Sequence, residues 1–213
     1  MSGAAFAICR ATFESLGGFD ASFFLYMEDT DLSWRARLAG YECLYVPESV
    51  VHHDYVFRFG PRKIYYLERN RYVMLLKSLR WRTLLVFAPV FLLGEVVTWG
   101  FVLLREPRRV MNKLQAYVWV VSHWARIMEA RRSVQMLRRV PDRELIESCT
   151  YRLAFEQTGG GRVARIAHWA FDPLFLLLKR LGLRLLPRTG GPGSLARLGE
   201  THGARSGAEL MLE

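Results

Sequence analysis

Apolar and polar positions change period several times over the first 60 residues of the chain. Ala4–Cys9 is a short apolar run typical of a buried strand, and Glu42–Val46 and Val50–His53 have the same character. Between these runs, Ala11–Leu16 and Glu28–Ala39 have helical spacing, and each is followed by glycine, which commonly ends a helix. The pattern therefore predicts an α/β arrangement with at most three strands.

From residue 61 onward the pattern is almost entirely helical. Lys63–Leu79, Val110–Arg139 and Asp142–Phe155 are expected to be helices. Ala167–Leu186 is apolar but is interrupted by lysine and arginine, which favours a helix lying in a membrane interface over one that crosses it. Residues 188–213 are rich in glycine and have little apolar pattern, so we expect a disordered tail.

Thr83–Leu104 is the main membrane candidate. Its 22 residues include one charged residue, Glu95, and basic residues lie on both sides of it. About 20 apolar residues cross a bilayer core, so a single span is possible, and a buried core helix is the other alternative. The symmetric basic flanks favour a re-entrant hairpin that bends near Pro89–Gly94. Glu95 would then be protonated or paired.

Composition and charge limit the classes of function. With 213 residues, 51% of them apolar, and three widely spaced cysteines, the chain is neither wholly disordered nor a disulfide-stapled mini-protein. Residues 1–60 carry 4 arginines and 8 acidic residues, whereas residues 61–213 carry 26 basic and 12 acidic residues. The basic part indicates an anionic partner. Because its arginines flank apolar segments, we expect anionic lipid and no nucleic acid.

An acidic and aromatic segment carries the candidate chemistry. Asp20, Glu28, Asp29 and Asp31 lie close together, and Glu28 and Asp29 fall at the expected start of a helix, where backbone N–H groups favour carboxylates. Helix capping alone would also explain such a cluster. Asp31 and Arg35 are four apart, so we expect a structural ion pair.

Two metal-binding patterns occur in the same segment. Asp29-Thr30-Asp31 has the DxD form of metal–nucleotide sites in sugar transferases, but it falls inside a helical pattern, which argues against that role. His52 and His53 are adjacent, and on a strand only one of them could face a site. A neutral imidazole is a common metal ligand, although most histidines are ordinary surface or core residues.

The order of motifs resembles a known family. SGAAFAICR, GGFD, FFLYMED, DLSWRARLAGY, YVPESVV and HH follow one another as in the C-terminal half of the catalytic domain of family 2 glycosyltransferases, most like the bacterial rhamnosyltransferase type. The resemblance covers roughly residues 1–70, and Tyr66 and Arg69-Asn70 extend it.

The resemblance implies a truncated GT-A fold followed by a helical membrane-associated region, and an inverting transfer from a nucleotide-sugar to a glycan or lipid-linked acceptor. Asp29 matches the general base, and Glu28 would position Asp29 or the acceptor. The acceptor side matches a further group of residues, Gly17, Gly18, Phe19, Asp20 and Trp34. His53, with His52 as the alternative, matches the histidine that completes binding of a divalent metal, Mg²⁺ or Mn²⁺, or of the diphosphate.

The resemblance also sets expectations for organisation. Family members begin with a nucleotide-binding half, so we expect a fragment, a mis-called start or a split enzyme with a separate donor-binding half, inactive alone. The expected segments are 1–60 (catalytic portion), 61–105 (helix and membrane segment), 106–187 (basic amphipathic helices) and 188–213 (tail). We expect the cytoplasmic membrane, with the catalytic part facing the cytoplasm. The alternative function is a non-catalytic membrane adaptor or a gene remnant.

Overall fold

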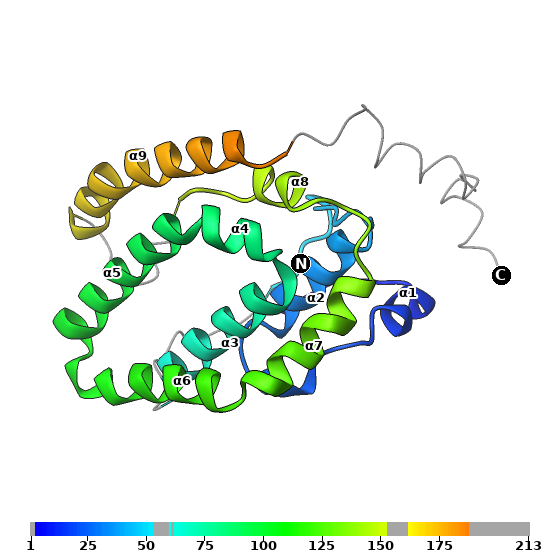
Figure 1. The fold of residues 1–213 in the computed structure, drawn as a ribbon, viewed down its shortest axis with the longest axis horizontal. Coiled ribbons are helices and arrows are strands. Elements are labelled where there is room, and N and C mark those ends of the chain that lie inside the picture. The colour runs from blue at the N-terminus through cyan, green and yellow to red at the C-terminus, as the bar shows by residue number, and fades with distance from the viewer. Residues whose placement is uncertain (1–2, 53–59, 61, 153–161, 188–213) are drawn as a thin grey trace.

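Helices make up the regular structure of the part of the chain that the computed structural model describes, residues 3–52, 60, 62–152 and 162–187 (Figure 1). In chain order the elements are α1 (Arg10–Ser15), the 3-10 turn η1 (Ala21–Phe23), α2 (Glu28–Leu38), α3 (Lys63–Ser78), α4 (Trp81–Val86), α5 (Ala88–Arg105), the 3-10 turn η2 (Pro107–Arg109), α6 (Val110–Ser122), α7 (Trp124–Met136), α8 (Asp142–Glu147) and α9 (Arg162–Leu185).

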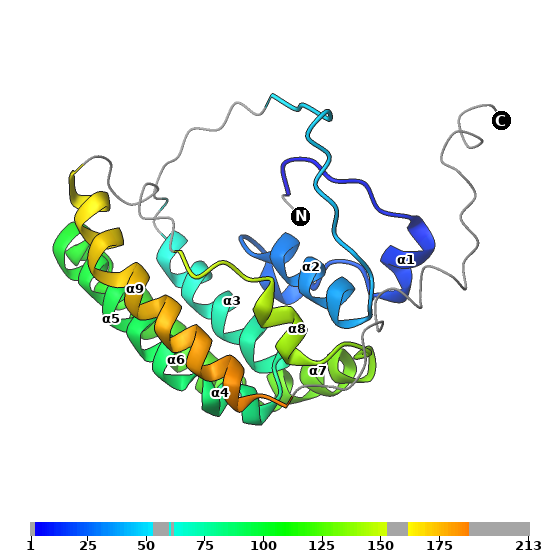
Figure 2. The same cartoon turned by 90° about the horizontal axis from the view of Figure 1, so that it is seen from above.

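The helix α3 occupies the centre of this arrangement. It contains neither glycine nor proline, and it ends where Leu79 takes an extended backbone conformation. It packs against α2, α6 and α7. Figures 1 and 2 show that α4, α5, α6 and α9 lie together in one layer, and that α1 and α2 lie on the far side of the molecule from it. The helix α3 therefore connects the acidic N-terminal part to the apolar layer.

Four groups of buried apolar side chains hold these elements together. One joins η1 and α3 to α6 and α7, and consists of Phe23, Val73, Met74, Val120 and Ile127. A second joins α1 to α2, and consists of Leu16, Leu32, Ala36 and Ala39. A third brings α8 and the end of α9 to α4, and consists of Leu79, Phe87, Ile146 and Leu186. A fourth joins α2 to α7 and α8, and consists of Leu38, Val134, Val140 and Leu145. Burial on both faces of α3 makes it the common support of both parts.

The prediction of an α/β GT-A fold is wrong for the described residues, which contain helices and no strand. Ala5 forms an isolated bridge, and residues 41–46 and 50–52 have no regular structure. A strand needs a neighbouring backbone to complete its hydrogen bonds, and an apolar run cannot supply one. The runs are also not buried, since Leu44 and Tyr45 are 80% and 86% exposed.

The helical predictions are confirmed in outline and corrected at their breaks. The stretch Thr83–Leu104 is divided at Phe87, ahead of Pro89, and α5 then runs unbroken through Gly94, so the predicted bend over Pro89–Gly94 is absent. Val110–Arg139 is likewise divided, at His123. Proline lacks the N–H that a helix interior needs, which is why it stands in the first turn of α5. The stretch 142–155 is helical only over α8 among the described residues.

Among the described residues, one helix, Ala88–Arg105, is long and apolar enough to cross a membrane by length and composition. Only 6% of that segment is buried within the protein, so it is not a core helix. Of the two alternatives expected for Glu95, protonated or paired, the structure shows pairing, although without the hairpin: its carboxylate contacts Arg71 of α3 and, at 3.1 Å, Lys113 of α6.

Candidate functional site

The first turn of α2 presents the two carboxylates that the sequence singles out. Asp29 is half-buried, and its Oδ2 accepts a hydrogen bond from the backbone N–H of Gly3 at 2.7 Å. Its Oδ1 accepts from the backbone N–H of Thr30 at 2.6 Å. A Cβ atom on residue 3 would lie 3.3 Å from that Oδ2, so glycine allows this close approach. These contacts fix the orientation of the Asp29 carboxylate.

Glu28 stands next to Asp29 and differs from it. Its Oε2 atom is buried and accepts no hydrogen bond from any of the described residues. A buried carboxylate oxygen normally has a partner, because its desolvation is otherwise uncompensated. Glu28 therefore has an acceptor atom to offer to a polar group from outside the described residues.

The loop that leads into α2 is held in an unusual conformation. Phe24, Tyr26 and Met27 all have positive φ angles, of 55°, 65° and 67°. Each such residue other than glycine costs on the order of 1–3 kcal/mol and persists only when its surroundings impose it. Phe24 is 76% exposed, and its ring lies 5.5 Å from that of Tyr66. The loop that precedes the two carboxylates in sequence thus displays an exposed aromatic side chain.

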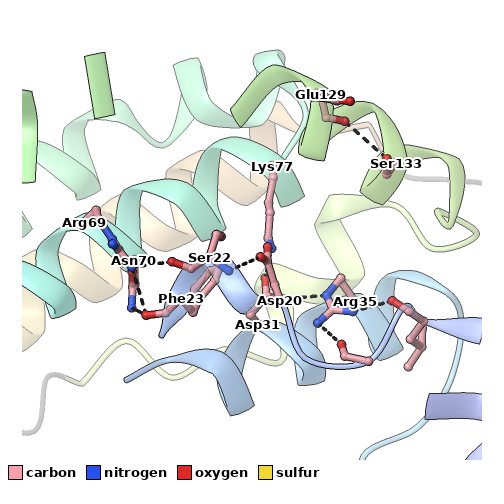
Figure 3. A network of polar contacts seen from close by, with 12 residues as sticks. Asp20, Ser22, Phe23, Asp31, Arg35, Arg69, Asn70, Lys77, Glu129 and Ser133 are labelled. Atoms are coloured by element: carbon pink, nitrogen blue, oxygen red, sulfur yellow. Dashed lines mark hydrogen bonds and ion pairs between the residues drawn. The ribbon is translucent and has the colours of Figure 1, made fainter. Parts of the chain in front are cut away.

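Two neighbouring side chains of α3 impose this conformation (Figure 3). The Nδ2 of Asn70 donates to the carbonyl oxygens of Phe23, Leu25 and Tyr26, at 3.1, 2.8 and 2.7 Å. The Nη2 of Arg69 donates to the carbonyls of Ser22 and Phe23 at 2.6 and 3.0 Å. Its Nε donates to Asn70 Oδ1 at 2.8 Å and so orients the carboxamide. We name this pair the Arg69–Asn70 clamp.

A buried ion network lies beneath the loop (Figure 3). The Lys77 ammonium of α3 is 1% exposed and contacts Asp20 and, at 2.9 Å, Asp31 Oδ1. Arg35 pairs with Asp31 at 2.8 Å, which confirms the predicted structural pair, and donates to the Leu16 carbonyl. Burial would raise the pKa of Asp20, but the charge and hydrogen bond of Lys77 outweigh it and lower the pKa to about 2.

The DxD interpretation is therefore disfavoured by geometry as well as by sequence. Asp31 is fully buried and faces Lys77 and Arg35, so its oxygens are engaged by two cations. Asp29 faces Gly3 and Thr30 at the other side of the helix. The two carboxylates do not converge on one position.

The other predicted acceptor-side residues have different contacts in the structure. Gly18 has a φ of 62°, and a Cβ there would lie 3.2 Å from the Phe13 ring. Phe19 is 45% exposed and packs edge-on against Phe6 and Phe13. Trp34 packs instead between two of the apolar groups, toward α3 and α4. Asp20 caps η1 through the N–H of Ser22 and pairs with Lys77. Phe19 thus offers an exposed surface, whereas Trp34 and Asp20 join the loop to the scaffold.

Of the two predicted metal ligands, only His52 is among the described residues. It is exposed, and His53 lies outside the described residues. Across the part of the chain that the structure describes, no three histidine, cysteine, aspartate or glutamate side chains come together as a metal site. A cavity of about 400 Å³ is lined by Arg37, residues 41–44 and side chains of α8, and by none of the predicted residues.

A second polar cluster, which the sequence analysis did not identify, joins α3, α5 and α6. Its members are Glu68, Arg71, Tyr72, Glu95, Lys113 and Tyr117. Lys113 is fully buried and lies 3.1 Å from both Glu68 and Glu95. Burial would raise the pKa of Glu95, but hydrogen bonds from Tyr117 and Tyr72 and the charge of Arg71 lower it to about 2. The lone charge within an apolar segment was the only signal of this cluster.

Comparison with known proteins finds a short similarity. The chain is 44% identical over 54 residues to an N-acetylglucosaminyl-diphospho-decaprenol L-rhamnosyltransferase of Mycobacterium tuberculosis, in strains CDC 1551 / Oshkosh and ATCC 25618 / H37Rv. The match covers 25% of this chain and 18% of the relative. No family model matches, and no solved structure matches. A quarter of the chain is therefore similar to a glycosyltransferase.

Proposed function

We propose that the chain carries the acceptor side of a membrane-associated glycosyltransferase, which transfers a sugar from a nucleotide-sugar to a glycan or lipid-linked acceptor with inversion. The observation that carries the proposal is the fixed Asp29 carboxylate at the start of α2, beside a strained loop that displays Phe24. The similarity to a rhamnosyltransferase whose name gives a diphospho-decaprenol acceptor supports it.

In this proposal Asp29 is the general base. It accepts the proton of the acceptor hydroxyl as that oxygen forms a bond to the anomeric carbon, while the bond from this carbon to the nucleotide diphosphate breaks and the diphosphate leaves with the electron pair. Glu28, with its unpartnered buried oxygen, accepts a hydrogen bond from a second hydroxyl of the acceptor. Phe24 and Phe19 supply apolar surface against a sugar ring or a prenyl chain.

The proposal names only the chemical class of the donor and of the metal ion. A nucleotide-sugar is the donor, and Mg²⁺ or Mn²⁺ would neutralise the leaving diphosphate. The described residues present no ligand set that fits such an ion, so we assign none of them to it. In the proposal, a separate partner chain binds the donor for this transfer. The protein acts at the cytoplasmic face of the membrane, where nucleotide-sugars and anionic lipids are found.

A transfer assay tests the proposal in cells of the source organism that carry the chain as their sole copy. Membranes from these cells receive a set of uridine, guanosine and thymidine diphosphate sugars and N-acetylglucosaminyl-diphospho-polyprenol. Asp29→Asn keeps the size of the side chain but cannot accept the proton, so we expect transfer to fall by about 10²–10⁴-fold with acceptor binding retained. Glu14→Gln, at an exposed position of α1, is the matched control. Transfer that is unchanged in Asp29→Asn would contradict the assignment.

The competing function is a non-catalytic membrane adaptor. The exposed apolar residues of α4, α5, α6 and α9 favour it, because they would serve such a role without Asp29. An adaptor predicts that Asp29→Asn supports growth and glycan synthesis as well as the wild-type chain does. The same strain therefore separates the two functions.

A further inference from the structure

The layer formed by α4, α5, α6 and α9 presents an apolar outer face. Each of these helices carries several exposed large apolar side chains. On α4 and α5 they are Trp81, Leu85, Leu92, Val96, Leu103 and Leu104; on α6 they are Met111, Leu114, Val118 and Val121; and on α9 they are Trp169, Leu174, Leu177, Leu181 and Leu185. Figure 2 shows α4, α5, α6 and α9 along one side of the molecule. Many exposed apolar side chains gathered on the helices of one side of a molecule indicate an interaction site.

The rotation of α5 about its axis is fixed by the polar cluster. Glu95 and Thr98 face Tyr117 and Lys113 of α6, and Val102 on the same side is buried. Leu92, Val96 and Leu103 recur at spacings of four and seven residues, so they share another face of the helix. The helix therefore turns its charged side to α3 and α6 and its apolar side outward.

The same cluster argues against a crossing orientation. If α5 crossed a bilayer with its contacts intact, α3 and α6 would accompany it and carry Glu68, Arg71 and Lys113 into the hydrocarbon. Ionised side chains there are costly and rare. Lying flat, α5 keeps the cluster on the protein side and turns the face with Leu92, Val96 and Leu103 to lipid, with the exposed Arg105 at its C-terminal end.

The charged residues of these helices indicate that the partner of the apolar face is anionic. On the described parts of α4, α5, η2, α6 and α9, six arginines are exposed, namely Arg82, Arg105, Arg108, Arg165, Arg180 and Arg184. The acidic residues of these elements, Glu95, Glu106 and Asp172, are in ion pairs. Exposed apolar side chains and exposed arginines on the same helices fit a membrane surface rich in anionic lipid, with Trp169 and Trp81 as aromatic anchors at the interface.

From these observations we infer that the α4–α5–α6–α9 layer lies flat in the interface of an anionic bilayer, with its outer face inserted and with α5 parallel to the membrane plane. This inference refines the membrane part of the proposed function and does not depend on sugar transfer. It replaces both the hairpin and the single span as the arrangement of Ala88–Arg105.

Flotation with vesicles tests the contact. The full chain is mixed with vesicles of phosphatidylcholine alone or with 30% phosphatidylglycerol. We expect at least tenfold more protein to float with the anionic vesicles at low salt, and a reduction at high salt. Leu92→Glu, on the outer face, should reduce binding at least tenfold. Leu44→Glu, at an exposed position in the extended segment away from the layer, introduces the same change as a control and should bind normally.

Accessibility to an impermeant maleimide tests the orientation. In a chain with Cys9, Cys43 and Cys149 changed to serine, Arg82→Cys and Arg108→Cys place one thiol before α5 and one after it. For protein added to the outside of sealed vesicles, the flat arrangement leaves both thiols reactive.

Protection of one thiol with reaction of the other would establish a span and overturn the inference. So would equal binding of Leu92→Glu and wild type, or the absence of binding together with a dimer that Leu92→Glu converts to a monomer, since a second copy would then cover the face. Each of these results leaves the transfer assay of Asp29→Asn unaffected.

Discussion

The carboxamide of Asn70 donates a hydrogen bond to the backbone carbonyl of Tyr26 at 2.7 Å, and so joins the central helix to the residue two before Glu28. Tyr26 has a φ of 65°, a conformation that side chains other than glycine and asparagine rarely adopt. The hydrogen bond from Asn70 of α3, 44 residues away in sequence, thus stabilises the strained conformation of the loop. The position of the Glu28 and Asp29 carboxylates depends on this long-range contact.

Asn70→Asp is expected to release the loop. A carboxylate has almost the same shape but cannot donate, so three carbonyl oxygens would face a negative charge in a buried place. Leaving buried groups without partners costs about 1–3 kcal/mol, and we expect a loss of stability at the upper end of that range. Urea unfolding measures it. Gln115→Glu, the same chemical change at an exposed position of α6, should alter stability by less than about 0.5 kcal/mol. Equal stability of Asn70→Asp and wild type would contradict the clamp.

Local sequence signals predicted the helices around the site, but not the long-range contacts that hold its loop in place. The glycine stops and the first-turn acids of α2 are local, so Glu28–Leu38 was predicted within one residue of its end. The Asp31–Arg35 pair follows from helical spacing alone. Lys77 and Asn70 reach the loop across 40 to 60 residues, and a single sequence contains no record of that proximity.

The sheet was the main error, and its cause is physical. The segment 41–46 has the composition of a strand, but a strand is defined by a partner, and composition does not supply one. For the apolar stretch 83–104, the sequence predicted the helix but not how it is oriented. Length and hydropathy suggested a membrane segment, whereas the contacts of Glu95 with Tyr117 and Lys113 decide how α5 is turned.

Lys77→Met tests the buried network beneath the loop. The change leaves Asp31, which is fully buried, with Arg35 as its only cation partner among those contacts, and leaves Asp20 unpaired. Breaking a buried ion pair costs about 3–5 kcal/mol, and we expect a loss of that size in chemical unfolding. Arg132→Met, an exposed cation on α7, is the control and should change stability by less than about 0.5 kcal/mol. If the two variants unfold at the same urea concentration, Lys77 does not hold the loop.

Glu95→Gln is expected to change how stability depends on pH. The pKa of Glu95 is lowered to about 2 from an ordinary value of 4.5, so the ionised form is favoured in the folded state. Its contribution is therefore complete above about pH 4.5 and is lost as the pH falls through about 2. At pH 7 the variant should be less stable by no more than about 3 kcal/mol, and the gap should close between pH 4.5 and 2.

Urea unfolding of both proteins at several pH values from 7 to 2.5 measures that gap. Because Asp20 titrates in the same range in both proteins, only the difference between them reports on Glu95. A difference that is independent of pH would show that Glu95 contributes through packing alone.

Gly182 and Gly100 provide a matched pair of helical glycines for testing how α9 docks. A Cβ at residue 182 would lie 2.7 Å from the buried ring of Phe87, whereas a Cβ at residue 100 would meet nothing within 4 Å. Alanine is favoured over glycine in a helix by up to about 1 kcal/mol, so Gly100→Ala should raise stability by up to that amount. Gly182→Ala should instead lower it by about 1–3 kcal/mol, because Phe87 has no room to move. Thermal or urea unfolding of the two variants measures whether their stability changes have opposite signs, as expected if α9 packs on Phe87. Stabilisation by both would mean that α9 does not pack on Phe87, and the α9 part of the apolar layer would then have to be placed differently.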